Sequence, residues 1–195
     1  MIRNLFAFIF KLLGWSLDGS FEPQPPKFII IVAPHTSNWD FPLGIMVRRI
    51  ARINRTKFLG KSQLFKFPHG FFFRALGGYP VERTKFNNIV DAVVDIFNRK
   101  EQFSIALAPE GTRSKVDRIK TGFYHIAKKA NVPIILVGFD FTRKKVVIKE
   151  PMYTSDNILN DFKHIIDFFS TIKGKNPELG VDKVLLGKMK THLEK

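Results

Sequence analysis

The sequence predicts an α/β fold with a mostly parallel central sheet flanked by helices. Short, continuous apolar runs at 27–33, 103–108 and 133–139 are typical of strands that are buried on both faces. Between them lie helical segments at 89–97 and 122–130. This alternation favours a parallel sheet, because parallel strands need a crossover connection, which is usually a helix.

The first fifteen residues predict a helix that lies in a membrane interface. They are strongly apolar, but Arg3, Asn4 and Lys11 interrupt the run. The uninterrupted part is too short to cross a bilayer, which needs roughly 20 residues. The basic start resembles a signal peptide, but no small-x-small cleavage site follows. We expect Trp15 near the headgroup level; the alternative is a first helix that packs in the core.

Three prolines between positions 23 and 26 predict a linker, because proline interrupts a helix. We therefore divide the chain into a membrane-interface helix at 1–20 and a main domain at 27–195. The 195-residue length suits one compact domain with a sizeable core.

The remaining elements follow in order along the main domain. Strands are predicted at 27–33, 57–60, 103–108, 133–139 and 145–148, and helices at 39–54, 63–76 (broken by Pro68 and Gly70), 89–97, 122–130 and 158–169. Asn87 or Asn88 is expected to cap the third helix and Asp156 the last. A glycine turn at 77–78 leads to Val81, and the tail from residue 173 is basic.

Charge and composition narrow the function classes. The net charge of +15 favours an anionic partner, whether nucleic acid, an acidic membrane surface or a phosphorylated substrate. The alternative is a solvated lysine surface. The absence of cysteine excludes disulfides, thiolate chemistry and cysteine-ligated metals. The five histidines form no His-x-x-x-His or Glu-x-x-His pair, so no metal site is expected.

The first candidate site is the turn His35–Asp40, directly after the strand at 27–33. Ligands of α/β proteins gather beyond the carboxyl ends of strands. With His35 in the turn and Asp40 in the first helical turn, the chain can fold back and bring the carboxylate to one ring nitrogen. The other nitrogen can then take a proton from a hydroxyl. In the alternative interpretation, Ser37 and Asp40 form a capping box and His35 is an ordinary turn residue.

The second candidate site is the loop Pro109–Ser114, which again directly follows a strand. Gly111 allows the backbone to approach a ligand closely. Arg113 offers a planar fork that suits phosphate, and Thr112 adds a hydroxyl. The alternative is a polar loop with a surface arginine.

Three further cations stand beside predicted element ends. Arg83 follows the glycine turn, Lys61 follows the short strand at 57–60, and Lys120 precedes the helix at 122–130. Each of them, taken alone, is more typical of a solvated surface residue than of a ligand contact.

Together and in this order, these segments resemble the glycerophospholipid acyltransferase family, which includes 1-acyl-sn-glycerol-3-phosphate acyltransferases. The family's four blocks correspond to 35–40, 77–83, 109–114 and 132–135, and the resemblance covers about residues 28 to 140. It implies a glycerol-3-phosphate acyltransferase-like fold. The second block departs from the family pattern at Tyr79-Pro80 and the fourth at Leu136, which puts substrate identity in doubt more than chemistry.

The resemblance implies a role for each matched residue. His35 would be the general base and Asp40 its orienting partner. Binding of the acceptor's phosphate or polar head is assigned to Arg83, Glu110, Gly111, Thr112 and Arg113, with Lys61 and Lys120 as further contacts. The acceptor hydroxyl would attack a thioester directly, with no cofactor, no metal and no covalent intermediate.

The resemblance also implies the substrates and the location. A fatty-acyl group would pass from coenzyme A or acyl carrier protein to a lysophospholipid, foremost 1-acyl-glycerol-3-phosphate, in phospholipid biosynthesis. The protein would be peripheral or monotopic on the cytoplasmic face of a membrane. Alternatives are another acceptor, such as an amino-acid-linked lipid or dihydroxyacetone phosphate, and a non-catalytic membrane-binding relative. No nucleic-acid partner is expected, because the phenylalanines cluster in apolar segments.

Overall fold

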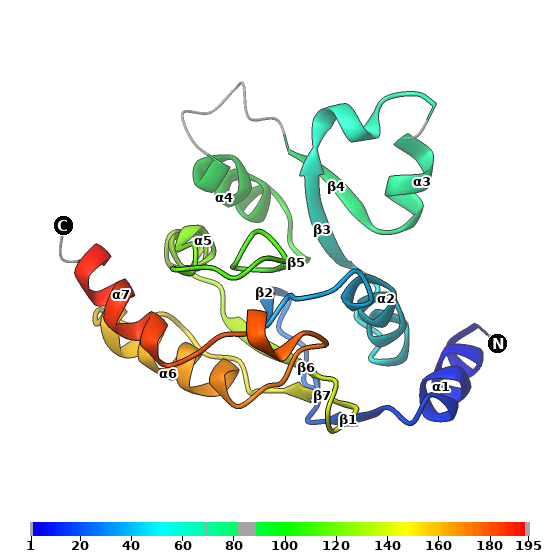
Figure 1. Cartoon of the computed structure of the whole chain (residues 1–195). Helices are drawn as coiled ribbons and strands as arrows, with labels where there is room; N and C mark the ends of the chain where they lie inside the picture. Colours follow the sequence, from blue (N-terminus) through cyan, green and yellow to red (C-terminus); the bar gives the residue numbers. More distant parts are fainter. Residues whose placement is uncertain (1, 69, 82–88, 194–195) are drawn as a thin grey trace.

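The computed structural model describes residues 2–68, 70–81 and 89–193 (Figure 1). They form a seven-stranded sheet in the order β1-β7-β6-β2-β5-β3-β4. Every neighbouring pair of strands is parallel except β6 and β7, which are antiparallel. The predicted α/β class with a mostly parallel sheet is therefore confirmed.

The strands and helices have the following bounds. The strands are β1 Ser16–Asp18, β2 Lys27–Val32, β3 Thr56–Lys61, β4 Gly78–Val81, β5 Phe103–Leu107, β6 Ile134–Asp140 and β7 Lys145–Ile148. The α-helices are α1 Ile2–Leu12, α2 Asp40–Ile50, α3 Gly70–Ala75, α4 Ile89–Arg99, α5 Gly122–Ala130, α6 Ile158–Ser170 and α7 Val184–Leu193. Two 3-10 helices, η1 Ser62–Phe65 and η2 Pro177–Leu179, complete the described elements.

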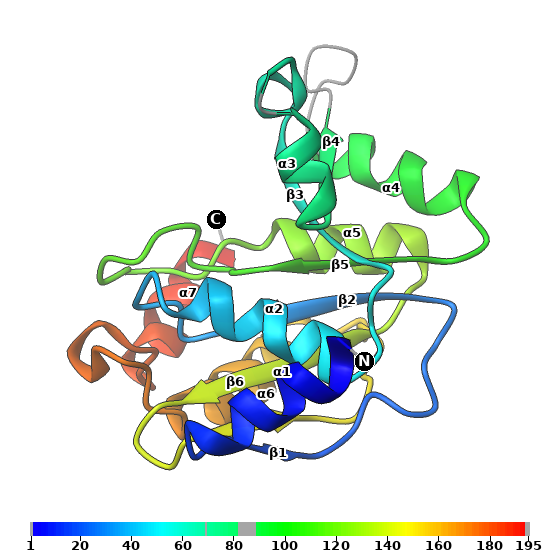
Figure 2. The ribbon, with the colours of Figure 1, turned by 90° about the vertical axis from the view of Figure 1, so that its right-hand side faces the viewer.

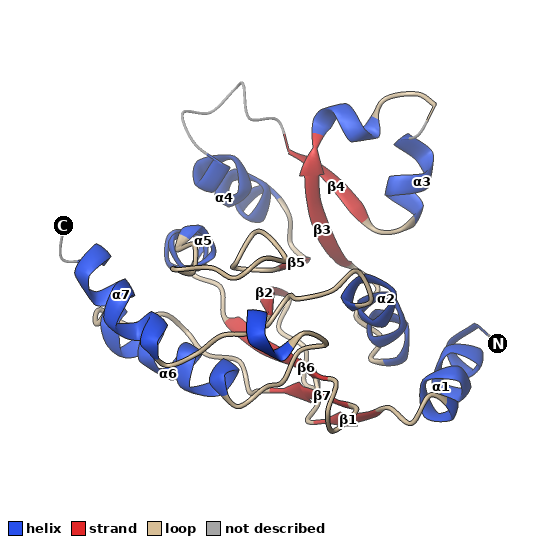
Figure 3. Cartoon of the chain, in the orientation of Figure 1, coloured by secondary structure: helices blue, strands red, loops and turns tan. Residues whose placement is uncertain are grey.

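Helices cover both faces of the sheet, and each face has its own core (Figure 3). Along β2, Ile29 and Ile31 pack in the core beneath α4, α5 and α6, whereas Phe28 and Ile30 pack in the core beneath α1 and α2. Successive side chains of a strand point to opposite faces, so a central strand must be apolar at every position. This explains the continuous apolar run from which β2 was predicted.

The two strands that the sequence did not predict are short and lie at the edges of the sheet. Among the described strands, β1 pairs only with β7 and β4 pairs only with β3. β4 contains Gly78 and Pro80, which ordinarily argue against a strand. Proline is tolerated here because an edge strand leaves one side of its backbone without a partner strand.

The structure adds detail to three regions of the prediction. The helix expected at 39–54 ends at Ile50, because Arg52 takes a left-handed conformation (φ 59°) and turns the chain toward β3. The segment 63–76 is divided into η1 and α3, as its proline and glycine led us to expect. The tail after residue 173 contains η2 and α7.

The expected cap at Asp156 is wrong. The cap of α6 is Asn157, whose side-chain oxygen accepts a hydrogen bond from the backbone N–H of Asn160 at 3.0 Å. Asp156 instead pairs with Lys128 at 3.2 Å. The helix begins at Ile158, as expected, so its capping position is residue 157 and not 156. Asn87 and Asn88 lie outside the described residues.

The N-terminal helix packs on the domain through one side only. Phe10 is buried in the core beneath α1 and α2, and Trp15 meets the ring of Phe141 edge to face at 5.0 Å. The opposite side exposes Leu5, Phe8 and other large apolar residues. Within the described residues, no helix has the length and apolar character that crossing a bilayer requires.

Candidate functional site

The predicted pair His35 and Asp40 is formed. His35 lies in the turn beyond the carboxyl end of β2, and Asp40 is the first residue of α2. His35 Nδ1 lies 2.9 Å from Asp40 Oδ2. Asp40 is 4% exposed, whereas His35 is partly accessible. A buried carboxylate at this distance holds the imidazole in one orientation and leaves Nε2 as the nitrogen that can accept a proton.

The same carboxylate also organises the turn. Asp40 Oδ2 accepts a hydrogen bond from the backbone N–H of Ser37 at 3.0 Å. Asp40 Oδ1 is buried and has no hydrogen-bond partner among the described residues. The alternative capping box is not formed: the residue before α2 is Trp39, which has no side-chain cap, and the Ser37 hydroxyl accepts the backbone N–H of Trp39 at 3.2 Å. Only the carboxylate half of that pattern is present, on the same oxygen that contacts His35.

Glu110 supports the turn from the neighbouring strand. It follows β5, which pairs in parallel with β2, so both segments emerge at the same edge of the sheet. Glu110 is 5% exposed, and its Oε1 accepts the backbone N–H of His35 at 2.9 Å. Burial raises the pKa of this carboxyl above its usual value. In this arrangement the Glu110 side chain holds the backbone of His35.

A third support comes from the segment 174–176, which the sequence did not indicate. Asn176 donates hydrogen bonds to Thr36, from its backbone N–H to Oγ1 at 3.2 Å and from its side-chain amide to the carbonyl oxygen at 2.7 Å. A Cβ on Gly174 would come within 2.6 Å of Thr36 Oγ1. The Lys175 ammonium lies 4.6 Å from the centroid of the Trp39 ring. The hydrogen bonds between Asn176 and Thr36 join residues 140 positions apart, so no local pattern reveals them.

The loop after β5 is more exposed than the turn after β2. Gly111 takes φ +68°, and Lys120 packs so closely against it that a Cβ would meet its ammonium. Thr112 and Arg113 are exposed. The loop is tied to the C-terminal part of the chain by ion pairs, one of them between Lys115 and Asp182 at 2.9 Å.

The remaining predicted cations are Lys61 and Arg83. Lys61 is the last residue of β3, where its backbone is in register with Val81. Arg83 lies outside the described residues. No group of three or more His, Asp or Glu side chains suited to a metal ion occurs in the described ranges.

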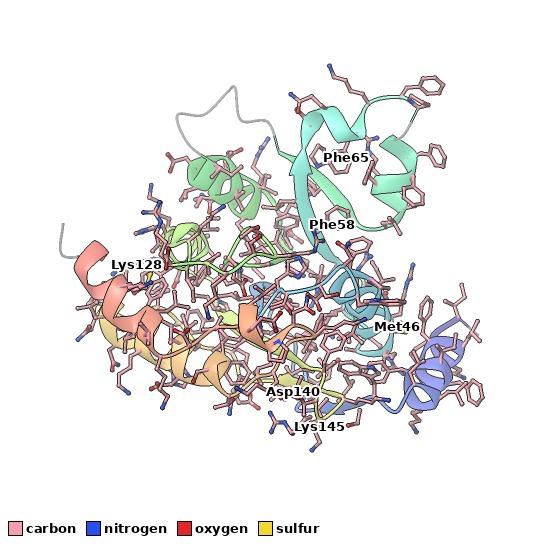
Figure 4. The ribbon with its side chains drawn as sticks, in the orientation of Figure 1. Met46, Phe58, Phe65, Lys128, Asp140 and Lys145 are labelled. Atoms are coloured by element: carbon pink, nitrogen blue, oxygen red, sulfur yellow. The ribbon has the colours of Figure 1, made fainter. Side chains whose placement is uncertain are left out.

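An apolar pocket of about 480 Å³ opens beside the histidine pair. Its lining includes His35, Asp40 and Arg113 beyond the carboxyl ends of β2 and β5, and it continues to Thr56 at the amino end of β3. The side chains between these ends are mostly apolar; they include Val32, Ile45, Val47, Phe58, Val137 and Phe139. Figure 4 shows Phe58 beside α2, where its ring meets that of Phe41 edge to face at 5.8 Å. The pocket thus runs between α2 and the sheet and ends at a proton acceptor.

Comparison with known proteins gives relatives that share one description. The family model described as Acyltransferase matches residues 21–140. A Haemophilus influenzae protein named 1-acyl-sn-glycerol-3-phosphate acyltransferase is 29% identical over 185 residues, which covers 81% of this chain and 74% of that protein. A Salmonella typhimurium protein of the same name is 32% identical over 124 residues, covering 60% of this chain and 49% of that protein. This chain therefore spans about half the length of the second relative.

A solved structure shares the fold. The crystal structure of the 1-acyl-sn-glycerophosphate acyltransferase from Thermotoga maritima matches with a TM-score of 0.50 and 23% identity. The match covers 83% of this chain and 73% of that chain. The turn after β2 lies inside the region matched by the family model, whereas the 174–176 segment lies outside it.

Proposed function

The chain belongs to the Acyltransferase family, and from this premise we propose that it transfers a fatty-acyl group from a thioester to the hydroxyl of 1-acyl-sn-glycerol-3-phosphate. The observation that carries the proposal is the His35–Asp40 pair, 2.9 Å apart, in the lining of an apolar pocket. This combination supplies a proton acceptor beside space for a hydrocarbon chain.

The proposed chemistry uses the two ring nitrogens of His35 for different purposes. Asp40 holds Nδ1, and Nε2 takes the proton of the acceptor hydroxyl as its oxygen attacks the thioester carbonyl. The carbon–sulfur bond then breaks, and the thiolate takes the proton from the imidazolium. None of these reaction steps needs a cofactor, because the thioester itself carries the activated acyl group.

The pocket accounts for the acyl chain. Its apolar walls between α2 and the sheet exclude water from the chain, and its polar end brings the thioester to His35. Either coenzyme A or acyl carrier protein is compatible with this arrangement as the donor's thiol carrier.

The loop after β5 accounts for the acceptor's phosphate. Arg113 lines the pocket at its polar end and is exposed, so its guanidinium is free to take up a bidentate phosphate contact there. Thr112 and Lys120 are exposed on the same loop and add donors and charge. The names of the Haemophilus and Salmonella relatives support 1-acyl-sn-glycerol-3-phosphate as this acceptor.

An acceptor with one acyl chain partitions into membranes, so the protein would work at a lipid surface in phospholipid biosynthesis. We assign it a peripheral or monotopic position on the cytoplasmic face. The exposed apolar side of α1 and the net charge of +15 support contact with an anionic bilayer.

Thiol release from palmitoyl coenzyme A tests this function. Wild-type protein should release thiol only when lysophosphatidic acid is added, and His35→Ala should lower the rate by about a thousandfold. The Thr36 neighbour gives a matched control, because Thr36→Ser keeps the hydroxyl that contacts Asn176 and should stay active. Dihydroxyacetone phosphate and an amino-acid-linked lysolipid serve as competing acceptors. Full activity of His35→Ala would defeat the proposal.

A further inference from the structure

The described residues 66–68 and 70–74, here named the aromatic tip, expose three phenylalanines at one corner of the molecule. Phe67 is 97% exposed, Phe71 76% and Phe72 54%. Single exposed apolar residues are ordinary on protein surfaces, but three large rings within six residues are not. The tip therefore calls for an apolar partner.

Packing contacts within the tip explain why these rings are exposed. Phe65 is buried beneath the tip, and its ring meets that of Phe73 at 6.2 Å (Figure 4). The guanidinium of Arg74 donates a hydrogen bond to the carbonyl oxygen of Phe65 at 2.9 Å and also lies over its ring. Gly70 sits so close to the same carbonyl that a Cβ would come within 2.0 Å of it. The rings of Phe65 and Phe73 are thus fixed inward, which leaves the three exposed phenylalanines pointing outward.

A second apolar surface lies on the same side of the molecule. α1 exposes large apolar residues that include Ile2, Leu5, Phe8 and Leu12, and Leu13 directly after the helix is exposed as well. Both α1 and α3 lie at the right-hand side of Figure 1, which is the side that faces the viewer in Figure 2. α2 lies between them, and Arg48 of α2 donates to the carbonyl oxygen of Leu76, just after the tip, at 3.0 Å. Phe41 and Leu76 from this region also line the pocket.

We propose that the aromatic tip inserts Phe67, Phe71 and Phe72 into an anionic lipid bilayer and, together with α1, docks the pocket against it. The inference rests on the proposed function, which places the substrates in a membrane. Charge selects the partner: Lys66 is exposed in the tip, Arg3 and Lys11 are exposed on α1, and the whole chain carries +15. Apolar residues flanked by basic ones are the pattern of an interfacial contact with acidic lipid.

Two contact points have a consequence that one lacks. A single amphipathic helix leaves the domain free to turn about its attachment, whereas contacts on both sides of α2 hold the pocket toward the lipid. The tip therefore adds orientation as well as affinity, since each of its rings leaves water on insertion.

The test compares vesicle binding of the full chain with that of Phe67→Ser/Phe71→Ser/Phe72→Ser. Sedimentation with phosphatidylglycerol-containing vesicles should show partitioning weakened by about tenfold or more, and phosphatidylcholine vesicles should bind both proteins weakly. A matched control, Tyr153→Ser/Val184→Ser, alters two other strongly exposed side chains that lie outside α1 and the tip and should bind as wild type does. Unchanged binding of the triple variant would overturn the proposal.

Two further measurements keep the test decisive. If the triple variant fails to fold, Phe67→Trp replaces it, and its tryptophan emission should shift to the blue on anionic vesicles; no shift would overturn the proposal.

Wild-type self-association that disappears in the triple variant, with vesicle binding intact, would assign the tip to a second copy instead. Vesicle binding needs no turnover, so a failed acyltransferase assay leaves this test unaffected. None of the three phenylalanines lines the pocket, so turnover with soluble short-chain substrates should be unchanged.

Discussion

The turn that follows β2 and the loop that follows β5 lie at the same edge of the sheet, but they are held in different ways. The turn is buried around Asp40, rests on the Glu110 carboxylate and is clamped by Asn176. Beyond Glu110, the loop presents exposed side chains and is tied down by surface ion pairs. A proton acceptor must be placed within a fraction of an ångström, whereas a phosphate can be met by adaptable cations. The difference in support therefore matches a difference in task.

The largest effect is expected from Asp40→Asn, a substitution at the centre of the turn after β2. The amide retains the shape of the side chain but no longer stabilises the imidazolium or selects its tautomer, so kcat should fall by about a thousandfold. Ser37→Ala is the matched control, because Asp40 accepts from the backbone of Ser37 and not from its hydroxyl. Steady-state kinetics measure both variants. A rate within tenfold of wild type would separate the carboxylate from catalysis.

Arg113→Ala tests the adaptable region and should act on a different kinetic constant. Loss of a charge-assisted contact to phosphate should raise the KM for the acceptor by about 10- to 100-fold and leave kcat nearly unchanged. Arg113→Lys retains the charge but loses the planar fork, so its KM for the acceptor should lie between those of wild type and Arg113→Ala. A fall in kcat with unchanged KM would show that the loop shares the task of the turn.

Asn176→Ala tests whether the clamp positions the turn. The substitution leaves the carbonyl oxygen of buried Thr36 without its donor, which should cost about 1–3 kcal/mol in the free energy of unfolding and lower kcat by about tenfold. KM should not change, since Asn176 does not line the pocket. Lys175→Ala, which removes only a contact with the exposed Trp39 ring, should leave kcat near wild type. An equal loss of kcat in both variants would show that Asn176 does not specifically position the turn.

The smallest effect concerns the pH dependence of stability and Glu110. Burial raises the folded-state pKa of this carboxyl above the ordinary value of 4.5, so the folded protein retains a proton that the unfolded chain releases. The contribution of Glu110 to stability should therefore fall as pH rises from 4.5 through the raised pKa, and stay constant above it. Glu110→Gln has no such titration. Denaturant unfolding of both proteins across this range should show the variant gaining relative to wild type as pH rises; a constant difference would contradict the assignment.

The site was predictable from the sequence only where its geometry is local. His35 and Asp40 are five residues apart, so a turn followed by a helix brings them together whatever the rest of the chain does. The contact of Glu110 with His35 depends on β5 lying beside β2, and the clamp by Asn176 depends on the return of the chain after α6. Glu110 was singled out through the family resemblance, but its inward orientation was not foreseen.

By itself, the sequence determined the central strands, the amphipathic helices and the histidine–aspartate turn. Each of these is recorded in a short pattern: continuous apolar runs for strands buried on both faces, helical spacing for one-sided burial, and fixed spacing for the pair. Only the tertiary structure decided the edge strands β1 and β4, the clamp on Thr36 and the outward set of the tip's phenylalanines. A three- or four-residue edge strand gains its stability from the neighbour it pairs with, and a phenylalanine is buried or exposed according to what packs beside it, so neither is written in the local sequence.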